Sequence, residues 1–156
     1  MNAAANQTTV GQRYLLDTNV VSDTVRVRRD ERVYAWLNAL PLEDLFLSTI
    51  SLGELYYGVE RMPVGRRRSA LETWLERRIR EDFVGRILPF DAVCAGLWGS
   101  LMQKSKLATG DRNEIDTQIA ATALRHGLVL ATRNTKHFES LGIEIIDPWT
   151  AGLPPT

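Results

Sequence analysis

Acidic side chains follow several apolar runs of this chain, at the places where strands would end. Asp17 comes directly after the run YLL, and Asp91 follows RILPF. The polar residues Thr132, Arg133 and Asn134 lie at the end of the run LVLAT. Glu54 lies one turn into the helix expected after a further run, and Asp116 lies near the start of a later helix. Because open parallel sheets bind ligands outside the carboxyl ends of their strands, we expect these groups to meet at one edge.

The types of these residues indicate a hard metal cation. The chain has one cysteine, Cys94, and two histidines, His126 and His137, too few for a thiolate or imidazole centre. Mg²⁺ and Mn²⁺ take a few carboxylates and several waters. Such a site suits phosphodiester chemistry, because the cation neutralises the phosphate and lowers the pKa of a bound water.

Each acid also has a purely structural interpretation. Asp17 and Asp91 could be N-caps of the helices that follow them. Glu54 could be the capping-box partner of Ser51, and Asp116 a first-turn acid that complements the helix dipole. The residues alone leave these alternatives open, and it is the joint placement of the acids that favours a shared site.

Length and composition fit one globular domain. The chain has 156 residues, 44% of them hydrophobic, and 19 Lys and Arg balance 19 Asp and Glu. These values exclude disordered and coiled-coil classes, and zero net charge argues against a protein that coats nucleic acid through bulk positive charge. We see no secretory signal and no apolar run of about 20 residues, so we expect a cytoplasmic protein without membrane contact.

Short apolar runs alternate with amphipathic segments along the chain. This alternation predicts an α/β fold with crossover connections and a parallel sheet. Pro89 places its run at a sheet edge or at the end of a strand. The expected strands are 14–16, 45–49, 86–90, 128–132 and 143–146, and the main expected helices are 30–40, 51–62, 66–83, 92–107 and 115–125.

Three segments together resemble one known family. They are LLDTNVVSD at 15–23, SLGELYYGVERM at 51–62, and IDTQIAATALRHGLVLATRNTKHFESLGIEIIDPW at 115–149. In this order they resemble the PIN-domain ribonucleases of the VapC/FitB type, the toxins of type II toxin–antitoxin modules. The resemblance implies a three-layer α/β/α fold around a central parallel sheet of about five strands. It covers residues 13–149 and leaves 1–12 and 150–156 as expected flexible termini.

The resemblance also implies a catalytic site. Asp17, Asp116 and Glu54 match metal-ligating acids that bind Mg²⁺ or Mn²⁺, so that a metal-activated water cleaves RNA. The fourth catalytic position, often Asp in the family, is Asn134 here. An asparagine can orient a metal-bound water but brings no charge, and Asp91 is the alternative residue that could complete the site.

Supporting residues and partners follow from the same resemblance. Thr18 and Thr132 are expected to hold the acids by hydrogen bonds. The implied partners are an RNA substrate, an antitoxin that inserts a basic side chain among the acids, and a second copy in a homodimer, possibly within a larger toxin–antitoxin complex. Helices that carry Tyr56, Tyr57 and Trp74 could form a groove for the antitoxin, or these aromatics could belong to the core.

Three arginine-rich groups are candidates for contact with phosphates or partners. The group at 61–68 follows the Glu54 helix and is favoured for substrate or antitoxin contact, whereas the group at 77–80 is expected to be a solvated helix face. The groups are Arg26, Arg28, Arg29 and Arg32; Arg61, Arg66, Arg67 and Arg68; and Arg77, Arg78 and Arg80.

Two other functions remain open from the sequence. One is a Mg²⁺-dependent phosphohydrolase of another Rossmann-like family, since several such families carry an acid after the first strand. The other is a catalytically weak RNA- or protein-binding PIN module, for which Asn134 is the sequence hint.

Overall fold

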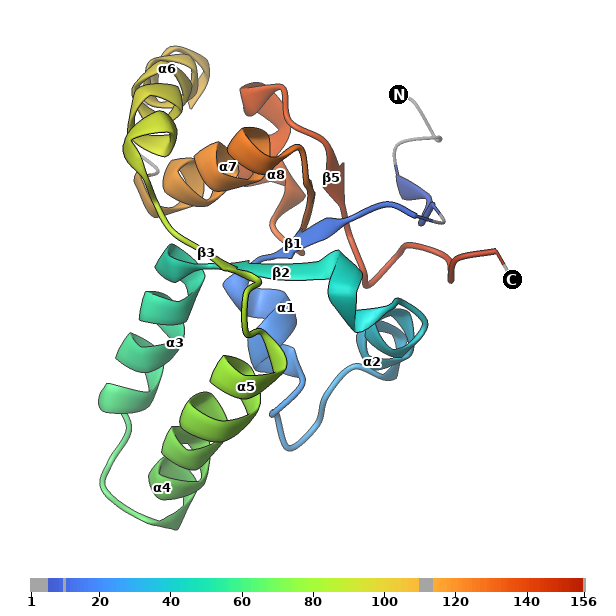
Figure 1. Cartoon of the computed structure of the whole chain (residues 1–156), viewed down its shortest axis with the longest axis vertical. Helices are drawn as coiled ribbons and strands as arrows, with labels where there is room; N and C mark the ends of the chain where they lie inside the picture. The colour runs from blue at the N-terminus through green and yellow to red at the C-terminus, as the bar shows by residue number, and fades with distance from the viewer. Residues whose placement is uncertain (1–5, 10, 110–113, 156) are drawn as a thin grey trace.

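Parallel strands form the centre of the protein (Figure 1). The computed structural model describes residues 6–9, 11–109 and 114–155. Within them the strands form one five-stranded sheet in the order β3-β2-β1-β4-β5, and every neighbouring pair is parallel. The strands are β1 (Tyr14–Leu16), β2 (Leu45–Ser48), β3 (Ile87–Leu88), β4 (Val129–Ala131) and β5 (Ile145–Ile146).

Helices cover both faces of this sheet. In Figure 1, α6, α7 and α8 lie above the sheet and α1 to α5 lie below it. The helices are α1 (Thr18–Asp23), α2 (Glu31–Asn38), α3 (Thr49–Glu60), α4 (Arg66–Thr73), α5 (Arg80–Asp82), α6 (Ala92–Thr109), α7 (Glu114–His126) and α8 (Thr135–Phe138), with 3₁₀ turns at Leu42–Asp44 and Glu139–Leu141. The predicted three-layer α/β/α arrangement is confirmed.

The central strand β1 divides the hydrophobic core into two halves. Its side chains alternate between faces: Tyr14 and Leu16 pack in the core with Trp36 of α2, and Leu15 packs in the other core with Ile119 of α7. All three residues of β1 are buried. An apolar run without polar alternation is therefore what a strand covered on both faces requires.

Local details differ from the sequence predictions at two helices. The side chain of Ser48 caps α3 by accepting the backbone N–H of Ser51 at 2.9 Å, so the predicted capping box of Ser51 and Glu54 is wrong. The predicted helix 66–83 is interrupted by the π-helix η3 (Trp74–Ile79) between α4 and α5. Leu75 and Ile79 of η3 are buried, so this segment still packs an apolar face against the core.

The edge strand of the sheet and the ends of the chain can be compared with the sequence predictions. β3 is an edge strand that ends directly before Pro89, as predicted. Residues outside 13–149 also contact the domain: Trp36 donates its indole N–H to Thr8, and the Thr8 hydroxyl donates to the carbonyl of Gly152. Residues 1–5, 10 and 156 of the expected flexible termini lie outside the described residues. Among the described helices, none combines the length and apolarity needed to cross a membrane.

We expect the Leu15→Ala substitution to lower the free energy of unfolding by about 2–5 kcal/mol, because Leu15 is fully buried between the sheet and α7 and its truncation leaves a cavity. Urea denaturation followed by circular dichroism measures the change. The exposed Val27→Ala substitution is the control and should change the value by less than about 0.5 kcal/mol. A loss for Leu15→Ala as small as that of the control would contradict the two-sided core.

Candidate active site

A buried carboxylate at the end of β1 is the centre of the candidate site. Asp17 is 4% exposed and is the N-cap of α1. Its Oδ1 accepts the backbone N–H of Thr18 at 2.7 Å. Its Oδ2 accepts the hydroxyl of Thr132 at 2.7 Å and the side-chain amide of Asn19 at 3.2 Å. Asp17 is therefore both a helix cap and a member of a polar network, so the two interpretations of this residue are compatible.

The network joins the carboxyl ends of β1 and β4, which are neighbours in the sheet. Thr132 follows β4, and its hydroxyl oxygen also accepts the backbone N–H of Asn134 at 3.1 Å. The side-chain amide oxygen Oδ1 of Asn19 accepts the backbone N–H of Arg133 at 3.3 Å. Asn134 is exposed, and its side chain makes no cap hydrogen bond to α8. The fourth predicted position therefore lies at the rim of the same network.

The other two predicted acids approach Asp17 from α3 and α7. The hydroxyl of Thr18 donates to Oε1 of Glu54 at 2.6 Å. Oδ2 of Asp116 is 2.8 Å from Nδ1 of His137, a hydrogen-bond distance. Thr18 and Thr132 therefore make hydrogen bonds to two of the acids, as the sequence predicted.

Sequence reasoning missed Asn19 and His137 as members of the site. Asn19 has a local signal, because it follows Asp17 by two residues at the start of a helix. His137 has none: it lies on α8, a single turn that the sequence analysis did not predict, and it reaches Asp116 only through the packing of α8 against α7.

The electrostatics of the site are unfavourable for an ionised Asp17. Burial is the largest cause and raises the pKa of Asp17 from 3.8 to about 6. The hydrogen bonds from Thr132 and Thr18 lower it, whereas the negative charges of Asp116 and Glu54 raise it. The three acids are therefore close enough for their charges to interact, although they come from three distant segments of the chain.

The acids are near one another but are not converged as metal ligands. Within the described part of the chain, no three Asp, Glu, His or Cys side chains are grouped tightly enough to hold a metal ion. Glu54 is turned toward Thr18, and Asp116 is turned toward His137. The donor set nevertheless fits a hard divalent cation, since it consists of oxygen ligands whose excess negative charge a cation would relieve.

Asp91 lies in a different environment. Its Oδ1 accepts the backbone N–H of Cys94 at 2.9 Å, which is the predicted cap of α6, and its Oδ2 is 3.7 Å from Nε of Arg125. The hydrogen bond from Cys94 is the largest cause that lowers the pKa of Asp91. Asp91 is therefore engaged as a helix cap rather than in the network of Asp17.

A groove of about 400 Å³ opens beside the site between α1, α3 and α4. Thr18 and Glu54 line the end of the groove that belongs to the site, and Arg26 and Arg67 contribute positive charge. Its apolar wall consists of Val25, Leu55, Val59, Met62, Leu71 and Trp74. Trp74 is thus packed against the core and faces the groove as well, whereas Tyr57 is 65% exposed and does not line it.

This fold, with acids gathered at the carboxyl edge of the sheet, is that of an established family. The family described as the PIN domain matches residues 14–143, which is most of the chain. The chain therefore belongs to the PIN-domain family.

Individual relatives place it near the VapC and FitB proteins, as the sequence motifs predicted. The chain is similar to the VapC ribonuclease Y4jK of Sinorhizobium fredii, with 40% identity over 135 residues that cover 86% of this chain and 96% of that protein. It is similar to the toxin FitB of Neisseria gonorrhoeae, with 41% identity over 135 residues that cover 86% and 97%.

Solved structures agree with the sequence relatives. The fold matches that of FitAcB from Neisseria gonorrhoeae with a TM-score of 0.83 and 40% identity, covering 88% of this chain and 99% of that one. It also matches a chain of a toxin–antitoxin complex from Klebsiella pneumoniae with a TM-score of 0.63 and 27% identity, covering 86% and 97%.

We expect Asp17→Asn to raise the free energy of unfolding of the metal-free protein at pH 7. The raised pKa of Asp17 means that its stabilising contribution is present below pH 4 and is lost as the pH rises through about 6, a difference of about 3 kcal/mol. A neutral amide avoids this loss but keeps only part of the hydrogen bonding, so the expected gain is about 1–3 kcal/mol. Urea denaturation at pH 7 and at pH 4 measures it, and the gain should disappear at pH 4.

Asp30→Asn is a control that should change the free energy of unfolding at pH 7 in the opposite direction. The pKa of Asp30 is lowered to about 2, first by the hydrogen bonds from Arg32, so its carboxylate stabilises the fold above pH 4. Its amide variant should therefore lose stability at pH 7. If both variants shift stability in the same direction, the electrostatic assignment of Asp17 is wrong.

Proposed function

We propose that this chain is the toxin of a type II toxin–antitoxin module and acts as a Mg²⁺- or Mn²⁺-dependent endoribonuclease. The observation that carries the proposal is the buried Asp17 at the end of β1, whose pKa is raised by burial and by the charges of Asp116 and Glu54. Neighbouring acids at the carboxyl edge of a sheet, only partly compensated by hydrogen bonds, carry an electrostatic cost that a bound cation would relieve. The name of the relative Y4jK, a VapC ribonuclease, supports RNA as the substrate.

The residues of the site have distinct roles in this proposal. Asp17 and Asp116 hold the cation, with Thr132 and His137 fixing the direction of their carboxylates. Glu54 lines the end of the groove that belongs to the site, where it orients an attacking water and accepts its proton. When bound, the cation neutralises the scissile phosphate and makes a water acidic enough to act as a nucleophile.

Asn134 serves the same site without adding charge. Its amide lies at the rim of the network, where it can orient a water by hydrogen bonding. One acid fewer than in the commoner family pattern leaves less negative charge to repel phosphates, so RNA can approach more easily, while the affinity for the cation falls. Together with zero net charge, this predicts modest RNA affinity without metal and strong metal dependence of cleavage.

The groove between α1, α3 and α4 is the proposed site of the antitoxin. Its apolar wall suits the apolar face of an amphipathic helix. Glu54 at its end would accept a basic side chain from the antitoxin and so block the acids. The toxin–antitoxin complex from Klebsiella pneumoniae among the similar structures supports such a partner. A homodimer remains a prediction, which analytical ultracentrifugation of the purified chain tests.

Asp116→Asn should abolish metal-dependent RNA cleavage. The expected loss exceeds the roughly 10–100-fold typical of changing a residue that only supports a ligand, because the variant lacks one of the carboxylates that hold the cation. Gel assays of RNA cleavage with Mg²⁺, Mn²⁺ or EDTA measure activity, and thermal unfolding with and without Mg²⁺ measures metal binding.

Asp91→Asn is the matched control, since Asn is also a good N-cap and Asp91 lies outside the network of Asp17. It should retain cleavage and the stabilisation by Mg²⁺. Cleavage by Asp116→Asn at the rate of the unmodified protein would refute the assignment. Release of phosphate from small phosphoesters without RNA cleavage would indicate a different phosphohydrolase.

Gly58→Leu should weaken inhibition by the antitoxin while RNA cleavage continues. Gly58 lines the groove, and a Cβ placed there meets no atom within 4 Å, so a larger side chain fills space that the partner needs. Titration of the purified antitoxin against RNA cleavage measures the effect. Gly58→Ala is the control: it adds one methyl group, should stabilise α3 by about 0.5–1 kcal/mol, and should leave inhibition nearly unchanged. Equal inhibition of the Leu variant would exclude this groove.

A further inference from the structure

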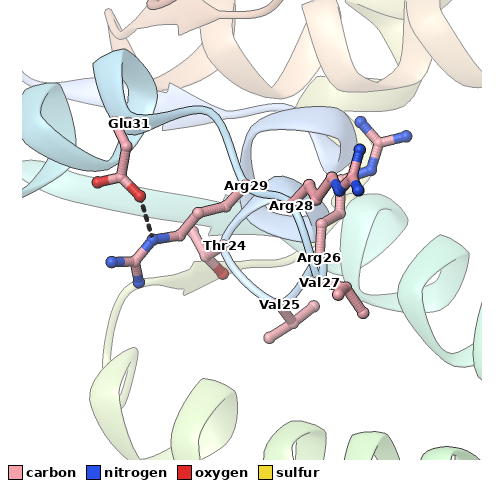
Figure 2. Close-up of a pocket in the computed structure, with 7 residues that line it drawn as sticks. All are labelled: Thr24, Val25, Arg26, Val27, Arg28, Arg29 and Glu31. Atoms are coloured by element: carbon pink, nitrogen blue, oxygen red, sulfur yellow. Dashed lines mark hydrogen bonds and ion pairs between the residues drawn. The ribbon is translucent and has the colours of Figure 1, made fainter.

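The loop between α1 and α2 carries arginines that the candidate active site does not use. We call residues 24–30 the arginine loop. Arg26, Arg28 and Arg29 line a hollow of about 320 Å³ there, together with Glu31 (Figure 2). Figure 2 shows that Arg26 and Arg28 extend to one side of the loop, whereas Arg29 extends to the other side toward Glu31.

Arginines on the α2 side of the loop are already engaged within the protein. Nε of Arg29 is 3.1 Å from Oε1 of Glu31, and its guanidinium lies 3.5 Å from the centre of the Tyr34 ring. Arg32, in the first turn of α2, donates to Asp30 at 2.7 Å. The charges of Arg29 and Arg32 are therefore matched by their neighbours.

Arg26 and Arg28, in contrast, keep their charge available. Nη1 of Arg26 is 3.6 Å from Oδ1 of Asp23, a long contact, and Oδ2 of this buried acid already accepts the backbone N–H of Asp30 at 2.8 Å. The Arg26 side chain is 63% exposed. For Arg28, the described residues provide no carboxylate within ion-pair distance.

The position of Arg26 connects this loop with the acids. Arg26 lines the hollow of the loop and also the groove that contains Thr18 and Glu54. The six residues of α1 separate the loop from Asp17, a length of about 9 Å. Arg67 of α4 donates to the carbonyl of Val25 at 2.5 Å and so holds the loop beside the groove, which Arg67 also lines.

We propose that Arg26 and Arg28 bind backbone phosphates of the RNA on one side of the scissile bond. This inference rests on the proposed ribonuclease function. The acids bind the scissile phosphate only through a cation, so the strand needs a second, positively charged contact to align it. Guanidinium groups match phosphate oxygens with paired hydrogen bonds, and two of them on one side of a fixed loop follow a strand for a few nucleotides. The contact is independent of base sequence.

The test measures RNA binding separately from cleavage. A short fluorescein-labelled single-stranded RNA of mixed sequence is titrated in EDTA, and fluorescence anisotropy gives its affinity over a series of salt concentrations. The variants are Arg28→Gln, the double variant Arg26→Gln/Arg28→Gln, and Arg77→Gln. Arg77 is an exposed arginine of η3 that lines neither the hollow nor the groove, so its variant is the control with the same change of charge.

Each lost phosphate contact should reduce the slope of log affinity against log salt by about 0.7, so the double variant should lose about 1.4 and the control nothing. With Mg²⁺, Arg28→Gln should raise the KM for RNA cleavage and leave kcat nearly unchanged, because Arg28 does not touch the acids. Thermal unfolding of all variants identifies any general loss of structure.

An unchanged salt slope in the folded double variant would overturn the proposal. So would a loss of affinity for the antitoxin with unchanged affinity for RNA, because the loop would then be part of the antitoxin surface. The proposed function can fail independently of this inference. If the wild-type protein binds RNA through these arginines but does not cleave it with Mg²⁺ or Mn²⁺, the phosphate contact is confirmed and the nuclease assignment is wrong.

Discussion

The burial of one carboxylate governs the arrangement of the candidate site. Asp17 stands at the end of the central strand, almost without access to water, and three donors from Thr18, Asn19 and Thr132 compensate its charge in part. Thr132 reaches Asp17 because β4 lies beside β1 in a parallel sheet. Two further acids then add negative charge instead of removing it. Because burial and these charges raise the pKa of Asp17, its ionised form lowers the stability of the fold at neutral pH.

The rest of the molecule supplies the rigidity that this arrangement requires. β1 is packed on both faces, so the end of the strand is fixed from above by α7 and from below by α1 and α2. The cap of α3 is provided by Ser48, which leaves the carboxylate of Glu54 free to accept the hydroxyl of Thr18. The N-cap of α3 thus leaves Glu54 available to pair with Thr18.

The sequence was sufficient for the sheet and for the position of Asp17 at its edge, because both follow from patterns of a few residues. Continuous apolar runs identify doubly covered strands, and an acid that follows such a run lies at the carboxyl edge. The contact of His137 with Asp116 could not be predicted in this way, since it depends on how α8 packs against α7. Within the arginine group at 61–68, Arg68 is paired with Glu60 and Glu72, whereas Arg67 lines the groove. Side-chain pairing depends on distances that spacing alone does not determine.

The hydrogen bond between Asp17 and Thr132 spans 115 positions of the chain, and it has a consequence for synthesis on the ribosome. Chains fold as they are made, from the N-terminus onward. The first acid is made early, but β4, which supplies its partner, follows only in the last part of the chain, and β5 must still be added beside it. A partly made chain therefore has no assembled site. The site therefore forms only when the chain is nearly complete.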